Sequence, residues 1–210
     1  MKKGTTWVVV SGEDKRREYL ARLRQEAHRL GHLVENVLFY ARLDSGRGAG
    51  LRESLELGAF LREKLGPLAE RAEKAGLQIA LESATPDGAR VRADGSALEQ
   101  ILLNLVDNAC KYAARSSPPT IEVRLECSKT RARIRVRDHG PGLSPAEKRR
   151  LFRPFSKSDR QAAMSAPGVG LGLALSRRLA RAQGGALRAE ECVAAGATFV
   201  LELPLDSGKA

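Results

Sequence analysis

The sequence predicts an α/β fold, a two-layer sandwich whose mixed sheet has three helices on one face, preceded by a long helix. Segments with apolar residues at helical spacing alternate with short segments in which every second residue is apolar. A heptad seam precedes them, and a glycine-rich stretch separates the two regions. At 210 residues, the chain is long enough for one medium-sized domain and an appendage.

The first predicted element is a helix over residues 14–44, which contain no proline and only one glycine, Gly31. Its apolar residues alternate at spacings of three and four, as in a dimerisation-type helix. A lone helix cannot bury this seam, so we expect it to pack against another helix, in this chain or in a second copy. A helix that lies on its own globular domain is the alternative, but it usually has a broader apolar face. The seam residues are Leu20, Leu23, Ala27, Leu30, Val34, Val37 and Ala41.

The chain divides best at residues 45–53, where three glycines within five residues stop the helix and indicate a linker. The segment before the helix matches no pattern that assigns it a structure. We therefore predict five parts: an unplaced segment 1–13, the helix 14–44, a linker 45–53, a main domain 54–205 and a tail 206–210.

The main domain alternates helical and extended patterns along its length. Helical spacing predicts helices over 55–75, 96–113 and 171–183, with a shorter helix near 145–151. Period-two alternation predicts the strands, which are 77–82, a short piece around Val91, 120–127, 131–137, 187–191 and 197–203. The segment 157–168 has few hydrophobic residues and is expected to be mobile.

Composition favours a globular protein in a reducing compartment. Hydrophobic residues make up 42% of the chain and charged residues 29%, and no apolar run is long enough to span a bilayer. No signal-peptide core follows the first residues. The three cysteines are too widely spaced for a disulfide framework or a metal-binding pair. We expect a cytoplasmic location for this chain, which does not exclude a membrane anchor in a longer parent protein.

The net charge of +11 raises the hypothesis of nucleic-acid binding, because phosphate contacts need lysine and arginine. However, the basic residues are scattered, and aromatic residues that could stack on bases make up only 4% of the chain. We predict no nucleic-acid partner. A polyphosphate ligand or an acidic protein partner fits the charge as well.

A polar stripe follows the helix predicted at 96–113, beside its apolar face. Asn104, Asn108 and Lys111 are spaced by four and three residues, so they lie on one narrow strip of the helix. Amide oxygens can ligate Mg²⁺, and a lysine ammonium can neutralise phosphate oxygens. The stripe therefore suits a metal-bound nucleoside triphosphate, although a solvated helix face would have the same composition.

Two further clusters contain residue types that suit a nucleotide. Asp138 ends a predicted strand, where a carboxylate can accept a hydrogen bond from an amine such as that of adenine, and Gly140 and Gly142 let the backbone approach a ligand. Residues 167–173 form a glycine-rich loop that enters a helix, whose N-terminal N–H groups would bind phosphate. That loop lacks the motif of a P-loop and the spacing of a dinucleotide fingerprint. Each cluster alone is weak, because turns use the same residues.

Taken in this order, the clusters resemble the GHKL or Bergerat-fold superfamily, and within it the sensor histidine kinases. The N box would be residues 104–112, Asn104-Leu-Val-Asp-Asn108-Ala-Cys-Lys111-Tyr112, and the first glycine box Asp138-His-Gly140-Pro-Gly142. The F box would be Phe152-Arg-Pro154-Phe155, and the second glycine box Gly168-Val-Gly170-Leu171-Gly172-Leu. A weaker third glycine box is Gly196-Ala-Thr198. The resemblance covers residues 15–204.

This resemblance implies a role for each matched position. Asp138 would bind the adenine amino group and Asn108 would ligate Mg²⁺. Asn104 and Lys111 would contact the phosphates as the catalytic residues. The span from Phe155 to the second glycine box would be a lid over ATP, with Phe152 and Phe155 as its anchors. The other nucleotide contacts would come from Tyr112, Gly140, Gly142, Lys157, Gly168, Gly170, Leu171, Gly172 and Thr198.

One position separates the kinases from the ATPases of the superfamily. Members that hydrolyse ATP have a glutamate four residues before the metal-binding asparagine, where it acts as the general base for water. This chain has Asn104 at that position, and an amide cannot take the proton. Phosphoryl transfer to a protein side chain is therefore the better interpretation.

The helix 14–44 is similar to the second helix of the dimerisation and phosphotransfer domain of sensor histidine kinases. The phospho-acceptor motif, His-Glu-Leu-Arg-Thr-Pro, belongs to the first helix of that domain and does not occur in this chain. His28 and His32 lack the acidic neighbour and the proline of that motif, so we interpret them as ordinary positions on a bundle helix.

The resemblance implies the ATP-binding catalytic domain of a protein histidine kinase, with ATP and Mg²⁺ as cofactors. It would transfer the γ-phosphate to a histidine outside this chain and signal to the receiver domain of a response regulator. A homodimer is expected through helix 14–44 or the missing partner helix, and the isolated chain is not expected to autophosphorylate. The alternatives are a serine or anti-sigma-type kinase of the superfamily and a pseudokinase that binds nucleotide as a scaffold.

Overall fold

The computed structural model of the chain describes residues 12–44, 50–83, 88–114, 116–156, 170–190 and 195–206. It forms two compact units, residues 1–38 and residues 39–210. Each unit is described by itself below. Among the described residues, no helix is both long and apolar enough to cross a membrane.

Helix α1 (Glu13–Asp44) provides the described part of the first unit and confirms the predicted long helix. Its apolar seam is exposed, with exposed fractions from 47% at Leu20 to 64% at Leu23. An exposed seam of this kind is stable only when another helix covers it. The end of α1, from Phe39 onward, belongs to the second unit. There Phe39 and Tyr40 pack partly against the core, and Arg178 lies 4.4 Å from the ring centroid of Tyr40.

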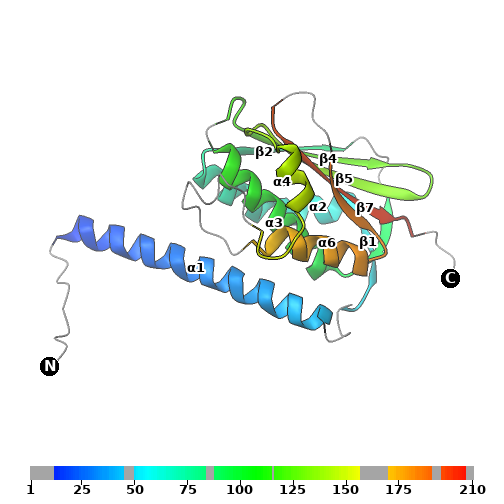
Figure 1. The fold of residues 1–210 in the computed structure, drawn as a ribbon, viewed down its shortest axis with the longest axis horizontal. Helices are drawn as coiled ribbons and strands as arrows, with labels where there is room; N and C mark the ends of the chain where they lie inside the picture. The colour runs from blue at the N-terminus through cyan, green and yellow to red at the C-terminus, as the bar shows by residue number, and fades with distance from the viewer. Residues whose placement is uncertain are drawn as a thin grey trace. The chain divides into compact units, whose positions relative to one another are not determined.

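The second unit is the predicted two-layer sandwich (Figure 1). Its sheet has five strands in the order β2-β4-β5-β7-β6. The pairing of β2 with β4 is parallel and the other pairings are antiparallel, so the sheet is mixed. The strands are β2 (Gln78–Ser83), β4 (Thr120–Cys127), β5 (Arg131–Asp138), β6 (Ala186–Glu190) and β7 (Ala197–Pro204).

Three main helices form the second layer, and their ends agree with the prediction within two residues. They are α2 (Leu57–Lys74), α3 (Gly95–Ala113) and α6 (Gly172–Ala182), with the short α4 (Pro145–Arg150) beside them. Helix α3 begins where the carboxylate of Asp94 accepts hydrogen bonds from the N–H groups of Ser96 and Ala97. The structure adds a strand that the sequence did not predict, β1 (Glu53–Glu56), which pairs with β3 (Arg90–Ala93).

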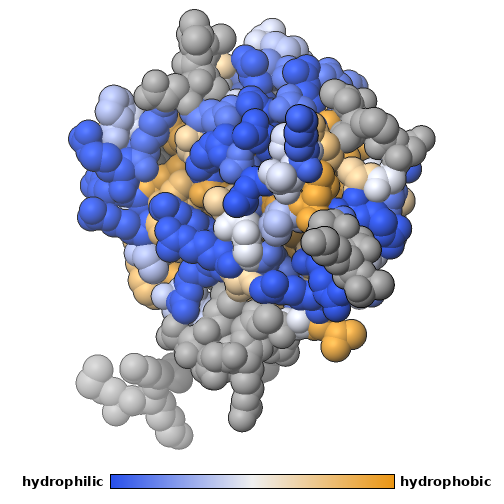
Figure 2. Space-filling view, turned by 90° about the vertical axis from the view of Figure 1, so that its right-hand side faces the viewer, coloured by the Kyte–Doolittle hydropathy of each residue, from blue (hydrophilic) through white to orange (hydrophobic). Residues whose placement is uncertain are grey.

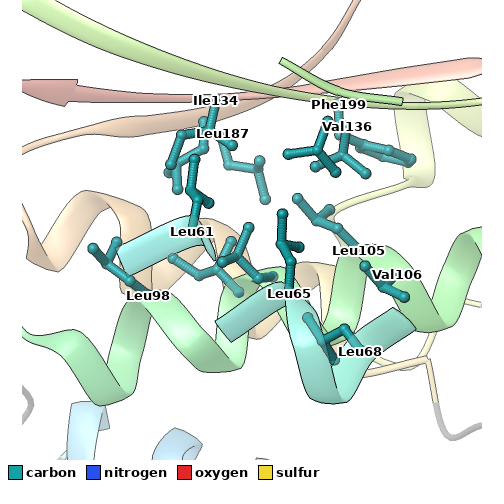
Figure 3. Packing of buried hydrophobic residues seen from close by; sticks show 14 of the residues in the cluster. Leu61, Leu65, Leu68, Leu98, Leu105, Val106, Ile134, Val136, Leu187 and Phe199 are labelled. Atoms are coloured by element: carbon teal, nitrogen blue, oxygen red, sulfur yellow. The ribbon is translucent and has the colours of Figure 1, made fainter. Parts of the chain in front are cut away.

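The core lies between the sheet and the helices (Figure 3). Strand β5 alternates strictly, with Ala132, Ile134 and Val136 buried on the helix side and arginines between them. Asp138 is the next residue in the same alternation, so the strand directs a carboxylate toward the helix layer at the point where the core ends. This alternation positions the candidate site.

The opposite face of the sheet explains much of the basic composition. Arg133 pairs with Glu202 at 2.7 Å and Arg135 pairs with Glu190 at 2.6 Å, and similar pairs join other strands. Arg133 and Arg135 of β5 therefore have acidic partners within the chain. Figure 2, which views the molecule from the right-hand side of Figure 1, shows mainly hydrophilic residues with hydrophobic ones between them.

Candidate functional site

Helix α3 positions the three residues of the polar stripe. Its apolar residues, among them Leu98 and Leu105, are at most 1% exposed in the core, which fixes the rotation of the helix about its axis. The stripe then runs from the buried Asn104 through the half-buried Asn108 to the exposed Lys111. A ligand from solvent would therefore meet the C-terminal half of the stripe first.

Asn104 lies at the contact between α3 and α6. Its amide nitrogen donates to the carbonyl oxygen of Gly172 at 3.2 Å and to Ser176 Oγ at 3.1 Å. The side chain thus joins the N box to the beginning of α6, where the predicted second glycine box ends. No motif in the sequence indicated Ser176, which is completely buried on α6.

Asp138 lies buried at the end of β5, with 6% of its surface exposed. Its Oδ1 accepts hydrogen bonds from the N–H of Gly140 at 2.9 Å and from the N–H of Ala197 at 3.3 Å. Burial raises the pKa of Asp138, because desolvation disfavours the charged carboxylate, and the two N–H groups oppose this shift only in part. Such a group is typical of functional sites.

The first glycine box brings the end of β5 against the end of α3. A methyl group added at Gly140 would lie 2.9 Å from the carbonyl oxygen of Tyr112, closer than a side chain tolerates. Gly142 follows with a φ of +74°, a conformation that favours glycine. Tyr112 is half-buried at this contact. The predicted residues Asp138, Gly140 and Tyr112 are therefore neighbours in the structure.

The beginning of α6 lies beside the F box. A methyl group added at Gly170, which has a φ of +75°, would lie 2.6 Å from the carbonyl oxygen of Ser156. The residues that flank segment 157–169 are therefore in contact. Leu171 is buried and precedes α6, but its side chain makes no capping hydrogen bond. Lys157 and Gly168 lie outside the described residues, and so does the whole segment 157–168. Their contacts and the mobility of this segment stay predictions.

The two phenylalanines of the F box differ. Phe152 packs partly against the core, and the guanidinium carbon of Arg177 lies 4.8 Å from its ring centroid. Phe155 is 69% exposed and has a φ of 58°, so its side chain is not the buried anchor that we expected. Its backbone, next to Ser156, lies against Gly170 instead.

The register of β5 and β7 corrects the position of Thr198. Thr198 pairs with Arg137, and Ala197 pairs with Asp138. Paired residues share a face of the sheet and consecutive residues alternate, so the Thr198 side chain lies on the face opposite to Asp138. The backbone N–H of Ala197 contacts Asp138 instead, and the sequence pattern missed this because it was displaced by one residue.

Two side-chain pairs near the site were also missed. Arg71 of α2 binds Asp107 of the N box through two contacts, Nε to Oδ1 at 2.5 Å and a terminal nitrogen to Oδ2 at 3.2 Å. His139 of the first glycine box contacts Glu122 of β4 at 2.8 Å. Both partners are distant in the sequence, so no local pattern could predict them.

The described side chains include no group of three or more His, Cys, Asp or Glu residues that could hold a metal ion. Asn108 offers one amide oxygen, which is a possible ligand for a hard cation. Mg²⁺ suits such a site, because it usually keeps several waters and binds substrate phosphates. The residues that are present fit Mg²⁺ bound to a nucleotide.

Comparison with known proteins finds a matching family and several related kinases. Residues 93–207 match the family model described as histidine kinase-, DNA gyrase B-, and HSP90-like ATPase. The chain is 29% identical over 199 residues to the circadian input-output histidine kinase CikA of Synechococcus elongatus. This alignment covers 94% of this chain and 26% of CikA. It is 32% identical over 195 residues to the sensor histidine kinase CpxA of Escherichia coli, with coverages of 93% and 41%.

A solved structure extends the comparison. The crystal structure of full-length ShkA in complex with AMPPNP matches with a TM-score of 0.72 and 31% identity, over 97% of this chain and 41% of that chain. The chain spans about a quarter to two fifths of the length of these relatives.

Proposed function

We propose a function from the premise that this chain belongs to the histidine kinase-, DNA gyrase B-, and HSP90-like ATPase family. Within that family it is the ATP-binding catalytic domain of a sensor histidine kinase. The proposal is that it binds ATP with Mg²⁺ and transfers the γ-phosphate to a histidine of a partner helix, from which a response regulator receives it. The buried carboxylate of Asp138, at the end of the core, is the observation that supports nucleotide binding most directly.

Asp138 would bind adenine. Its Oδ1 already accepts two backbone N–H groups, so Oδ2 is the oxygen to which the adenine amino group would donate. Gly140 and Gly142 would let the base approach the backbone, and Tyr112 would line the pocket. A site built to hydrogen-bond an amino group discriminates strongly against ligands that lack it, so guanine, with a carbonyl there, should bind weakly.

Asn108, Lys111 and the N-terminus of α6 would hold the triphosphate. Asn108 would supply an amide oxygen to Mg²⁺, which neutralises charge on the phosphates when bound. Lys111 is exposed and would add a positive charge. Leu171 provides no side-chain cap, so N–H groups in the first turn of α6 are suited to donate hydrogen bonds to phosphate oxygens, with Gly170 and Gly172 beside them.

Lys157 and Gly168 would contribute from the proposed lid, whose flanking residues Ser156 and Gly170 lie in contact.

Transfer rather than hydrolysis is favoured because position 104 offers no carboxylate as a general base for water. The homodimer would form through the exposed seam of α1 and the helix that carries the phospho-acceptor.

Calorimetry with AMPPNP and Mg²⁺ tests nucleotide binding. We expect binding that GTP does not reproduce at the same concentrations, because the adenine amino group is the recognised feature. If neither AMPPNP nor ADP binds to the purified chain, the proposed function is wrong.

The metal ligand is tested by Asn108→Ala. In Mg²⁺ we expect this variant to bind AMPPNP at least about tenfold more weakly than the wild type. It loses a metal ligand that contributes more than about 1 kcal/mol to the binding free energy. In EDTA the two proteins should bind alike. An equal loss in Mg²⁺ and in EDTA would show that Asn108 acts on the nucleotide without the metal.

A further inference from the structure

Two hydrogen bonds join the Asn104 side chain to α6, and they limit what else its amide nitrogen can bind. The side chain is 7% exposed and Ser176 is completely buried, so the contact lies inside the protein. Gly172 and Ser176 are four residues apart on α6 and therefore lie on the same side of that helix. One amide nitrogen bridges both of them from α3.

The chemistry of the amide fixes its orientation. The carbonyl oxygen of Gly172 can only accept a hydrogen bond, so the NH₂ group of Asn104 must face it rather than the amide oxygen. Both acceptors of this NH₂ group, Gly172 and Ser176, lie on α6, so the group is directed toward that helix. Phosphate oxygens are acceptors and need a donor. In this arrangement, the NH₂ group of Asn104 bonds to α6.

The amide also determines how closely α6 approaches α3. A methyl group added at Gly172 would lie 3.1 Å from Asn104 Oδ1 and 3.3 Å from its Cγ. The first residue of α6 therefore packs directly on the Asn104 side chain. A satisfied buried polar contact of this kind favours one arrangement of two helices over others.

We propose that Asn104 is a positioning residue, which holds the N-terminus of α6 at a fixed place against α3 and does not bind phosphate itself. The inference rests on the proposed function and assigns Asn104 a different role from the one that the family resemblance implies. It would set the distance between the N–H groups of α6 and the side chains of Asn108 and Lys111, which together hold the triphosphate.

The test compares ADP with AMPPNP, both with Mg²⁺, on the full chain. Asn104→Ala removes the amide, Asn104→Asp keeps its shape but removes both donors, and Ser176→Ala removes one acceptor. Affinities are measured by calorimetry at a temperature at which circular dichroism shows each variant to be folded.

We expect both Asn104 variants to bind ADP and AMPPNP more weakly by the same factor, about tenfold. Ser176→Ala should weaken both nucleotides about threefold, and the double variant Asn104→Ala with Ser176→Ala should bind no more weakly than Asn104→Ala alone. This non-additivity is expected if both residues act through one contact.

Two results would overturn the inference while leaving the proposed function intact. The first is a loss of AMPPNP affinity with unchanged ADP affinity in Asn104→Ala, together with a wild-type-like Ser176→Ala, because that pattern indicates a γ-phosphate ligand. The second is a lower melting temperature with unchanged affinities, which indicates a purely structural contact.

If Asn104→Ala does not fold, Ser176→Ala decides. A loss of affinity for both nucleotides supports the inference, and unchanged affinity overturns it. Failure of the wild type to bind either nucleotide would overturn the proposed function as well.

Discussion

Asp138→Asn is expected to bind ATP about tenfold to a hundredfold more weakly than the wild type while remaining folded. The N–H groups of Gly140 and Ala197 would still find an acceptor, because the amide oxygen takes the place of Oδ1. This choice directs the NH₂ group toward adenine, so a donor faces the adenine amino donor. A buried donor without an acceptor costs about 1–3 kcal/mol. Calorimetry with AMPPNP measures the loss, and unchanged affinity would exclude Asp138 from adenine binding.

The same substitution is expected to stabilise the unliganded chain at neutral pH. Burial raises the pKa of Asp138 above its ordinary value of 3.8, so the folded state binds the proton more tightly than the unfolded state. The wild type therefore loses stability as the pH rises from this ordinary value through the raised pKa, and the loss is constant above it. Asp138→Asn has no such loss. In urea unfolding at several pH values, the stability advantage of the variant should grow through this window and then level off.

Gly196→Ala is expected to destabilise the domain by about 3 kcal/mol or more and to abolish nucleotide binding. Gly196 has a φ of +115°, which disfavours any other residue. In addition, the added methyl group would overlap the carbonyl oxygen of Asp138. The ends of β5 and β7 would have to separate, and Asp138 would move with them. Urea unfolding and calorimetry measure the two effects.

Gly88→Ala is the matched control for that prediction. Gly88 has a similar φ of +107°, but a methyl group there would have no atom within 4 Å. We expect it to cost only about 1 kcal/mol, from backbone strain alone, and to leave nucleotide affinity unchanged. Equal losses of stability in the two variants would show that the contact with Asp138 is unimportant.

The sequence predicted the helices and the main strands because their periodicity is local. Strand β1 was missed, since its four residues gain their stability from pairing with β3, and nothing near Glu53–Glu56 in the sequence indicates that partner. Thr198 shows a second limit. A shift of one residue along a strand changes the face of the sheet, so a loosely matched box placed the wrong residue beside Asp138.

Asn104 shows a third limit. The spacing on α3 identified Asn104, Asn108 and Lys111 as one stripe, and the structure keeps them on that helix. The partners of Asn104 come 68 and 72 residues later in the chain, so the sequence could not show that its amide nitrogen bonds to α6. The sequence could predict that these three side chains share one strip of α3, but it could not predict the hydrogen-bond partners of Asn104.

Transfer of labelled γ-phosphate tests the central proposal most directly. The chain is incubated with Mg²⁺ and γ-labelled ATP, alone and with a separately purified dimerisation domain that contains the phospho-acceptor histidine, and Asp138→Asn serves as the inactive control. We predict an acid-labile, alkali-stable phosphate on the added domain and none on this chain. Label that stays on His28 or His32 of this chain, label on serine, or release of phosphate without transfer would contradict the account.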